Sequence, residues 1–225
     1  MAKRRPLHPA RRVAVIGLGR FGASLAAELV REGVDVVGFD SDPGTVQRYT
    51  DDLPNSAIVD STDPAALVQL GVADFDHVAV CIGSDLEASI LTVSAVADLG
   101  VTDLWAKATS RQHGRILERV GAHHVVLPEH DMGERVAHLV TGRRMLDYIE
   151  FDEEFAIAKA PAPRELFGVT LKSSRVRNRF GVTIVAVRRP GGGYEFAGLD
   201  TVIGEDDLLI VSGPVRSVER FAARH

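Results

Sequence analysis

The stretch Arg12-Val13-Ala14-Val15-Ile16-Gly17-Leu18-Gly19-Arg20-Phe21-Gly22 decides the fold of this 225-residue chain. It begins with a short apolar, β-branched run that is typical of a buried strand. The glycines that follow have the spacing GxGxxG, and residues 21–31 place apolar side chains on one helical stripe. A strand, a glycine turn and a helix in this order predict a phosphate-binding turn, in which the glycines permit close approach of the backbone to phosphates.

The alternation of strand and helix continues for more than half of the chain. Ser41-Asp42-Pro43 and Thr62-Asp63-Pro64 are signals for helix N-termini. Further helices are expected over residues 86–99 and 110–120, and further strands over 34–39, 57–59, 78–82, 104–106 and 124–127. This order predicts an α/β fold with a doubly wound, parallel, Rossmann-like sheet.

The pattern changes near residues 147–154. A helix over 132–144 leaves the sheet, and a small α+β region follows it. There we expect strands at 155–159, 182–188, 194–196 and 208–212 and helices at 171–180 and 215–224, with Pro161 and Pro163 breaking the first strand. We therefore expect a basic disordered tail (1–11), a nucleotide-binding domain (12–146) and a small α+β domain (147–225).

Composition excludes several classes of protein. The 26 basic and 31 acidic residues give a net charge of −5, which argues against a general nucleic-acid binder. No apolar run approaches the roughly 18 residues of a membrane helix, and we expect no signal peptide. The single cysteine, Cys81, rules out a disulfide framework and favours a reducing cytoplasm. The basic cluster within residues 3–12 is either a solvated tail or a tether to anionic lipid or an acidic partner.

Asp40 and Arg20 are the most informative polar residues near the glycine turn. Asp40 ends the second expected strand, where an acid binds ribose hydroxyls, and it disfavours the 2′-phosphate of NADP. Arg20 lies in the first turn of a helix, where a cation opposes the macrodipole at a cost of roughly 0.3–1 kcal/mol. A bound polyphosphate would make the position of Arg20 favourable instead. Alternatively, Arg20 is a surface arginine paired with an acid.

Further candidate residues follow the carboxyl ends of the other strands, where this fold binds ligands. They are Asp60 and Ser61, Ile82-Gly83-Ser84, Lys107 and Glu129. Glu129 suits a phosphate site only if something neutralises it, such as a metal ion shared with phosphate oxygens; otherwise it is a helix N-terminal acid. His113 is either a core histidine or one that faces a ligand.

Several motifs together resemble the Trk/Ktr potassium-uptake regulators, the RCK (KTN) proteins, and especially their Ktr-type cytosolic regulatory subunits. The resemblance covers nearly the whole chain from Arg12. The motifs that carry it are residues 15–22, 82–89 and 105–108, the stretch Pro128-Glu129-His130-Asp131-Met132-Gly133, and the C-terminal runs 166–171, 181–187 and 207–211.

The resemblance implies a non-enzymatic sensor that forms dimers and then an octameric ring on the cytoplasmic face of a membrane potassium channel or transporter. It implies ATP or ADP as ligand, with Mg²⁺ or another cation at Glu129, and NAD(H) as a further ligand. The expected nucleotide site comprises Gly17, Gly19, Arg20, Phe21, Gly22, Asp40, Ser41, Asp42, Asp60, Ser61, Ile82, Gly83, Ser84, Lys107, Ala108, Thr109, His113 and Glu129. In relatives the C-terminal domain also binds cyclic di-AMP, and Val176 and Arg177 stand at the matching positions, although Val182 and Thr183 match poorly.

Two other functions share the glycine turn. A small NAD-dependent oxidoreductase suits Asp40 equally well, but we find neither a Ser/Tyr/Lys nor a His/Asp arrangement placed to pass a proton to a substrate. A redox-sensing repressor needs a DNA-binding segment, and the twelve-residue basic tail is too short for one.

Overall fold

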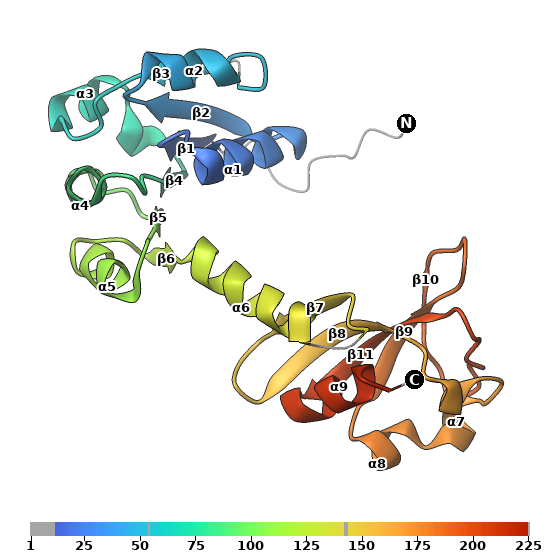
Figure 1. Cartoon of the computed structure of the whole chain (residues 1–225). Coiled ribbons are helices and arrows are strands. Elements are labelled where there is room, and N and C mark those ends of the chain that lie inside the picture. Colours follow the sequence, from blue (N-terminus) through green and yellow to red (C-terminus); the bar gives the residue numbers. More distant parts are fainter. Residues whose placement is uncertain (1–11, 54, 142–143, 225) are drawn as a thin grey trace. The chain divides into compact units, whose positions relative to one another are not determined.

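The computed structural model describes residues 12–53, 55–141 and 144–224 (Figure 1). The expected basic tail, 1–11, lies outside the described residues. The chain divides into two units between His130 and Asp131. This division falls inside helix α6 (Pro128–Thr141), earlier in the chain than the boundary expected at residue 146.

The first unit contains a six-stranded parallel sheet with the order β3-β2-β1-β4-β5-β6. This is the strand order of a doubly wound Rossmann-like sheet, so the expected fold class is confirmed. Its strands are Arg12–Ile16 (β1), Asp35–Asp40 (β2), Ser56–Ile58 (β3), His77–Val80 (β4), Leu104–Lys107 (β5) and His124–Val126 (β6). Its helices are Arg20–Arg31 (α1), Pro43–Tyr49 (α2), Pro64–Gln69 (α3), Leu86–Asp98 (α4) and Arg111–Arg119 (α5), with a 3₁₀ turn at Val72–Asp74.

Strand β1 shows why the sheet is covered on both faces. Ala14 and Ile16 lie in a core that includes buried residues of α3, α4 and α5. Val13 and Val15 point the other way, into a core with α1. Because side chains alternate along a strand, an unbroken apolar run has both of its faces buried.

Four helices of this unit begin with a side-chain cap. Asp42, Asp63, Asp85 and Ser110 each accept a hydrogen bond from a backbone N–H in the first turn of α2, α3, α4 and α5, respectively. The two Asp-Pro signals in the sequence thus begin helices as expected.

The second unit contains a five-stranded antiparallel sheet with the order β10-β9-β11-β8-β7. Its strands are Asp147–Glu150 (β7), Phe155–Pro161 (β8), Thr183–Arg188 (β9), Tyr194–Phe196 (β10) and Leu208–Pro214 (β11). Its helices are Leu171–Ser174 (α7), Val176–Phe180 (α8) and Val215–Ala222 (α9), with a 3₁₀ turn at Arg164–Leu166. A separate buried core joins these elements.

Several expected elements of this region need correction. The helix expected over 171–180 is two short helices, because Arg175 between them adopts a left-handed conformation (φ 48°). Strand β8 continues to Pro161, which is its last residue, where a missing N–H is tolerated. Strand β7 was not expected, and α6 begins at Pro128 rather than at Met132.

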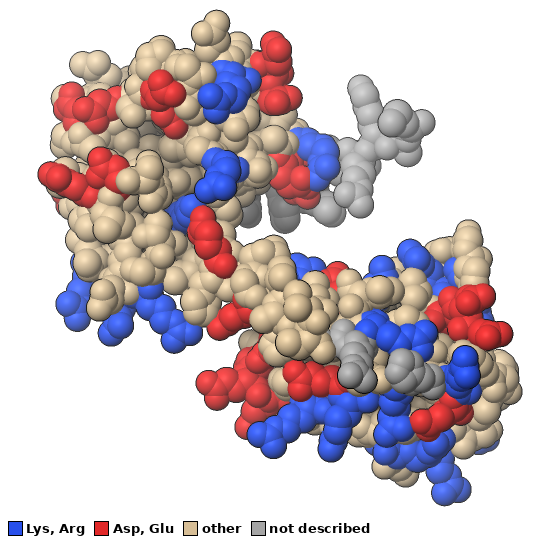
Figure 2. Space-filling model, viewed as in Figure 1, with Lys and Arg blue, Asp and Glu red and all other residues tan. Residues whose placement is uncertain are grey.

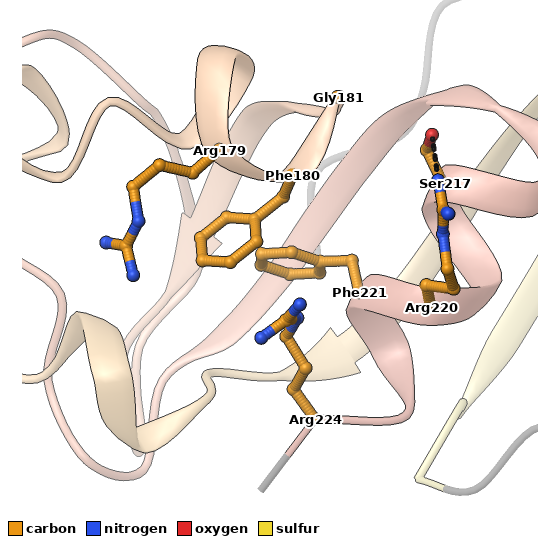
Figure 3. A pocket seen from close by; sticks show the side chains of 7 residues that line it. All are labelled: Arg179, Phe180, Gly181, Ser217, Arg220, Phe221 and Arg224. Atoms are coloured by element: carbon orange, nitrogen blue, oxygen red, sulfur yellow. Dashed lines mark hydrogen bonds between the residues drawn. The ribbon is translucent and has the colours of Figure 1, made fainter.

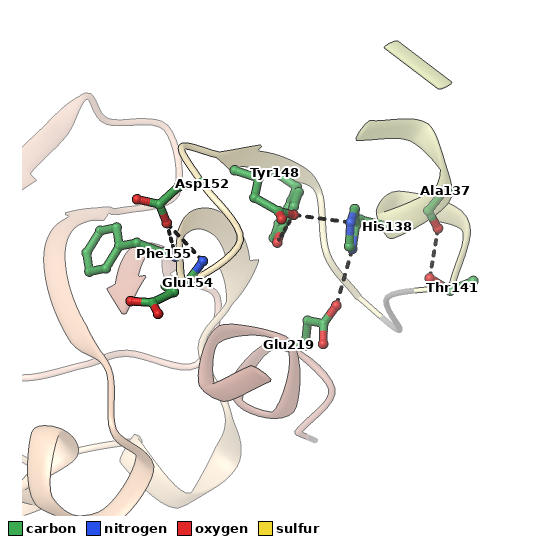
Figure 4. Close-up of polar contacts among 9 residues, drawn as sticks. Ala137, His138, Thr141, Tyr148, Asp152, Glu154, Phe155 and Glu219 are labelled. Atoms are coloured by element: carbon green, nitrogen blue, oxygen red, sulfur yellow. Dashed lines mark hydrogen bonds and ion pairs between the residues drawn. The ribbon is translucent and has the colours of Figure 1, made fainter. Parts of the chain in front are cut away.

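His138 joins the last turns of α6 to the second sheet (Figure 4). Its Nδ1 lies 3.2 Å from Glu219 Oε1 on α9, and its Nε2 lies 3.3 Å from Glu150 Oε2 on β7. Its ring stacks on Tyr148, whose hydroxyl donates to Glu150. These contacts fix the C-terminal part of α6 on the second unit.

Candidate functional site

The candidate site of the first unit is a cavity of about 640 Å³ beside the carboxyl ends of the parallel strands. Its volume is in the range of small-ligand sites. It is lined by Ile16, Gly17, Gly19, Arg20, Phe21, Asp40, Ser41, Asp42, Thr45, Asp60, Ser61, Thr62, Cys81, Ile82, Gly83, Ser84, Asp85, Ala88, Lys107, Thr109 and Glu129. Fifteen of the eighteen residues expected from the sequence are therefore brought together.

The three glycines of the turn have different roles. Gly17 has φ +93°, and a Cβ there would lie 3.0 Å from the backbone nitrogen of Ile82, so the turn requires glycine. A Cβ on Gly22 would lie 1.9 Å from the carbonyl oxygen of Gly17, so Gly22 serves the packing of α1 and does not line the cavity. A Cβ on Gly19 would meet no protein atom within 4 Å. Gly19 therefore leaves open space at the start of α1.

The N-terminus of α1 is organised differently from those of α2–α5. Its N-cap is Gly19, no side chain caps it, and its first turn contains no acidic residue. Arg20 is its first residue and is exposed, and within the described part of the chain its guanidinium makes no hydrogen bond or ion pair. Unpaired first-turn N–H groups and a nearby cation form a site for an anion such as phosphate.

Asp40 connects the glycine turn to the loop before α2. Its Oδ2 accepts from Leu18 N at 2.7 Å, and its Oδ1 accepts from Asp42 N at 2.9 Å. The carboxylate is thus held at the cavity wall as an acceptor, and each oxygen keeps a lone pair for a ribose hydroxyl.

Asp42 and Asp60 line the cavity but have local partners. Hydrogen bonds to Asp42, first from the Thr45 hydroxyl and then from the N–H groups of Gly44 and Thr45, lower its pKa. The Thr62 hydroxyl and N–H lower the pKa of Asp60 in the same way. Both residues therefore shape their loops, and both remain ionised beside the cavity.

Ser61 lies between the cavity and α4. It is buried, and its hydroxyl lies 2.9 Å from the hydroxyl of Thr92. Ser41, Ile82, Gly83 and Ser84 complete the wall as expected.

Lys107 and Glu129 form an ion pair in the cavity wall, with 2.7 Å between Lys107 Nζ and Glu129 Oε1. The side chain of Lys107 is 11% exposed and that of Glu129 is 65% exposed. The hydrogen bond from Lys107 is the main cause that lowers the pKa of Glu129, and the charge of Arg20 adds to it. Glu129 thus has the neutralising partner that a site for phosphates requires. Among the described residues, no three His, Cys, Asp or Glu side chains are grouped to hold a metal ion.

Ala108 and His113 were expected at the site but do not line the cavity. Ala108 is buried in the core. His113 is also buried, and its Nδ1 accepts from Thr109 N at 3.3 Å. Burial lowers the pKa of His113, which is therefore neutral near pH 7. His113 is therefore a core histidine, which is one of the two roles that the sequence left open; the other was a histidine that faces a ligand.

Several lining residues were not expected from the sequence. Thr45, Thr62 and Asp85 lie in or next to the N-termini of α2, α3 and α4, shortly after expected strands, so their position in the fold is the signal that could have found them. Cys81 also lines the cavity, but burial raises the pKa of its thiol to about 12. The thiol is therefore not a nucleophile at neutral pH.

The two residues expected to reach a second ligand lie in the second unit. Val176 is buried. Arg177 is exposed, and its Nε and Nη2 each donate to the Thr183 hydroxyl at 3.2 Å.

Known families match both units. Residues 13–128 match the TrkA-N domain, and residues 155–225 match the TrkA-C domain. The chain belongs to the TrkA-N family. The TrkA-N match covers the sheet and the cavity, and its limit at residue 128 lies close to the division of the structure at His130.

Curated relatives of this TrkA-N chain match it over nearly its full length. It is 42% identical over 212 residues to the Ktr system potassium uptake protein C of Bacillus subtilis (strain 168), covering 94% of this chain and 96% of that protein. It is 33% identical over 208 residues to the Ktr system potassium uptake protein A of the same strain, covering 92% and 94%.

Solved structures of the GsuK channel share the fold. Its RCK domain superposes with a TM-score of 0.67 at 20% identity, covering 98% of this chain and 49% of that chain. The GsuK channel bound to NAD gives a TM-score of 0.63 at 20% identity, covering 97% and 40%. The TrkA-N chain thus has the RCK fold in both of its units.

Proposed function

We propose that this TrkA-N chain is a non-enzymatic, nucleotide-sensing regulatory subunit of a Ktr-type potassium transporter. The observation that carries the proposal is the uncapped N-terminus of α1, which opens with Arg20 onto the cavity. The chain-long similarity to two Ktr potassium uptake proteins supports the potassium-transport role. Among the described helices, none is both long and apolar enough to cross a membrane. By analogy with the Ktr potassium uptake proteins, we propose that a separate membrane subunit carries the ion path and that this chain acts at its cytoplasmic face.

ATP or ADP is the proposed ligand, with NAD(H) as the alternative. The first-turn N–H groups of α1 and the open space above Gly19 receive the phosphates. Asp40 receives the ribose, since both of its oxygens are held as acceptors. Arg20 reaches the terminal phosphate and so distinguishes ATP from ADP.

Glu129 is the proposed position for a divalent cation bound with ATP. Its carboxylate is exposed and ionised, and it has the hard oxygen ligands that Mg²⁺ prefers. A cation held there would take its remaining ligands from phosphate oxygens and water. Lys107 holds Glu129 at the cavity wall through their ion pair.

Self-association into dimers and an octameric ring is part of the proposal. Met132, Val136 and Val140 form an exposed apolar stripe along α6 at helical spacing. In the first unit, exposed Trp105 lines an apolar groove of about 330 Å³ beside α1. Exposed apolar surfaces of this kind are typical of sites of protein association.

Potassium uptake tests the regulatory role. A bacterial host without its own potassium uptake would express the membrane subunit from the same organism, with or without this chain. We expect the chain to raise the initial uptake rate and Arg20→Ala to abolish the increase. Arg31→Ala, at the opposite end of α1, should leave it intact. An uptake rate that is the same with and without the chain would refute the proposal.

A further inference from the structure

The second unit contains a basic pocket of about 290 Å³ between the end of α8 and helix α9 (Figure 3). It is lined by three arginines, two phenylalanines, a serine and a glycine: Arg179, Arg220, Arg224, Phe180, Phe221, Ser217 and Gly181. Figure 2 shows many Lys and Arg side chains exposed on this unit. None of the pocket residues belongs to the nucleotide cavity of the first unit.

The two aromatic rings give the pocket a fixed base. Phe180 and Phe221 pack edge to face, with 5.6 Å between their ring centroids, and Phe221 is fully buried. The guanidinium carbons of Arg179 and Arg224 lie 4.7 Å and 4.5 Å from the Phe180 ring centroid. Cation–π contacts thus hold both guanidiniums in place before any ligand binds.

Positive charge in the pocket is only partly neutralised. Glu165 pairs with Arg179 at 3.1 Å through Oε2 and with Arg224 at 2.8 Å through Oε1. Within the described residues, Arg220 makes a single hydrogen bond, of 3.4 Å, to the Ser217 hydroxyl. Among the described residues, Arg179 and Arg224 therefore share one carboxylate, and Arg220 pairs with none.

The spare donors determine what the pocket can bind. Within the described part of the chain, Arg220 Nε and Nη1 and Arg224 Nη2 have no hydrogen-bond partner. A terminal phosphate carries a charge of about −1.5 to −2 at pH 7 and three strong acceptor oxygens. Its charge matches the excess of two positive charges, and guanidinium forks match its oxygens.

We propose that this pocket binds the terminal phosphate of a phosphomonoester. The site differs from the positions Val176 and Arg177 expected for cyclic di-AMP, because Arg177 bonds to Thr183 and does not line the pocket. A soluble phosphomonoester and a phosphomonoester lipid headgroup offer the same chemistry. The proposal does not depend on the proposed nucleotide site.

Equilibrium dialysis of the full chain with radiolabelled inorganic phosphate tests the site at constant ionic strength. Arg220→Gln is the test variant, since Arg220 has the fewest structural contacts of the three arginines. Arg216→Gln is the matched control: Arg216 is an exposed arginine one turn earlier in α9 that does not line the pocket. Arg20→Ala separates the pocket from phosphate binding at α1.

We expect saturable phosphate binding that weakens roughly tenfold or more in Arg220→Gln, as loss of a charged hydrogen bond implies. It should persist in both Arg216→Gln and Arg20→Ala. Displacement by glycerol 3-phosphate would assign a soluble ligand, and Arg220-dependent sedimentation with phosphatidate vesicles would assign a lipid headgroup. In the Arg20→Ala background, binding that never saturates, that survives Arg220→Gln, or that falls equally in Arg216→Gln would overturn the proposal.

Discussion

Lys107, the last residue of β5, places its ammonium 2.7 Å from the carboxylate of Glu129, the second residue of α6. The ion pair lies in the wall of the cavity that also contains Arg20. An acid in a phosphate site is unfavourable unless a cation accompanies it, and here the chain supplies that cation. The pair is mostly open to solvent at Glu129, so we assign it to ligand binding rather than to stability.

Replacing Lys107 with Met should weaken nucleotide binding with little effect on folding. The variant keeps the buried stem but removes the charge, so Glu129 faces the phosphates without a partner and its pKa rises toward the usual range. We expect the Kd for ADP to rise roughly tenfold or more, as for loss of a charged hydrogen bond. Calorimetric titration measures this, with Lys172→Met as an exposed control. An unchanged Kd would refute a role for Lys107 in binding.

Replacing Arg20 with Ala should remove the preference for ATP over ADP. Arg20 lies at the start of α1 and is not committed to another residue of the described chain, so it is available to the third phosphate. We expect ATP affinity to fall toward that of ADP, while ADP binding changes less. Competition between the two nucleotides measures the ratio. A ratio equal to that of the unmodified chain would contradict the assignment of Arg20.

Alanine at Gly22 and at Gly19 should separate packing from binding. A Cβ on Gly22 would overlap the Gly17 carbonyl oxygen. Gly22→Ala should therefore lower the free energy of unfolding by about 1–3 kcal/mol or more. Gly19→Ala meets no protein atom and should leave the melting temperature unchanged, while its methyl group enters the space for phosphates and weakens binding. Urea unfolding and ADP titration of both variants test this. Equal melting temperatures for the two variants would be inconsistent with the geometry.

Acidification should destabilise the chain partly through His113. Burial lowers its pKa in the folded state, whereas the unfolded state has the usual value near about 6.5. The unfolded state therefore binds more protons below that pH, and stability present above it is lost as the pH falls toward the folded pKa. Urea unfolding at pH 7.5 and 5.5 should show a smaller loss for His113→Gln than for the unmodified chain. The same loss in both proteins would exclude His113 as a contributor.

Much of the first unit could be predicted from local sequence. The β-branched run before Gly17, the GxGxxG turn and the caps at Asp42 and Asp63 are short-range signals, and the structure follows each of them. The carboxyl ends of parallel strands meet at one edge of the sheet. The positions of Asp40, Asp60 and Lys107 in the cavity could therefore also be predicted from the sequence.

The remainder depends on contacts between distant residues. Nothing local in the sequence shows that Lys107 pairs with Glu129 or that His113 is buried. Arg175 gives no glycine or proline signal, yet it adopts a left-handed conformation that divides the expected helix. Strand β7 has only four residues and gains its stability from pairing with β8. Tertiary packing overrides local propensity at each of these positions.

Ligand-dependent melting of the full chain shows whether the cavity binds an adenine nucleotide as a sensor site would. The ligands are ATP, ADP, NADH and NADPH, each with and without Mg²⁺. A ligand at 100 times its Kd stabilises the folded state by roughly 2.7 kcal/mol, which gives a clear shift. We predict shifts with ATP and ADP, an ATP shift that depends on Mg²⁺ and loses that dependence in Glu129→Gln, and none with NADPH. A shift with NADH alone would contradict ATP or ADP as the ligand and would leave an NAD(H)-binding regulator and a dehydrogenase as the two alternatives.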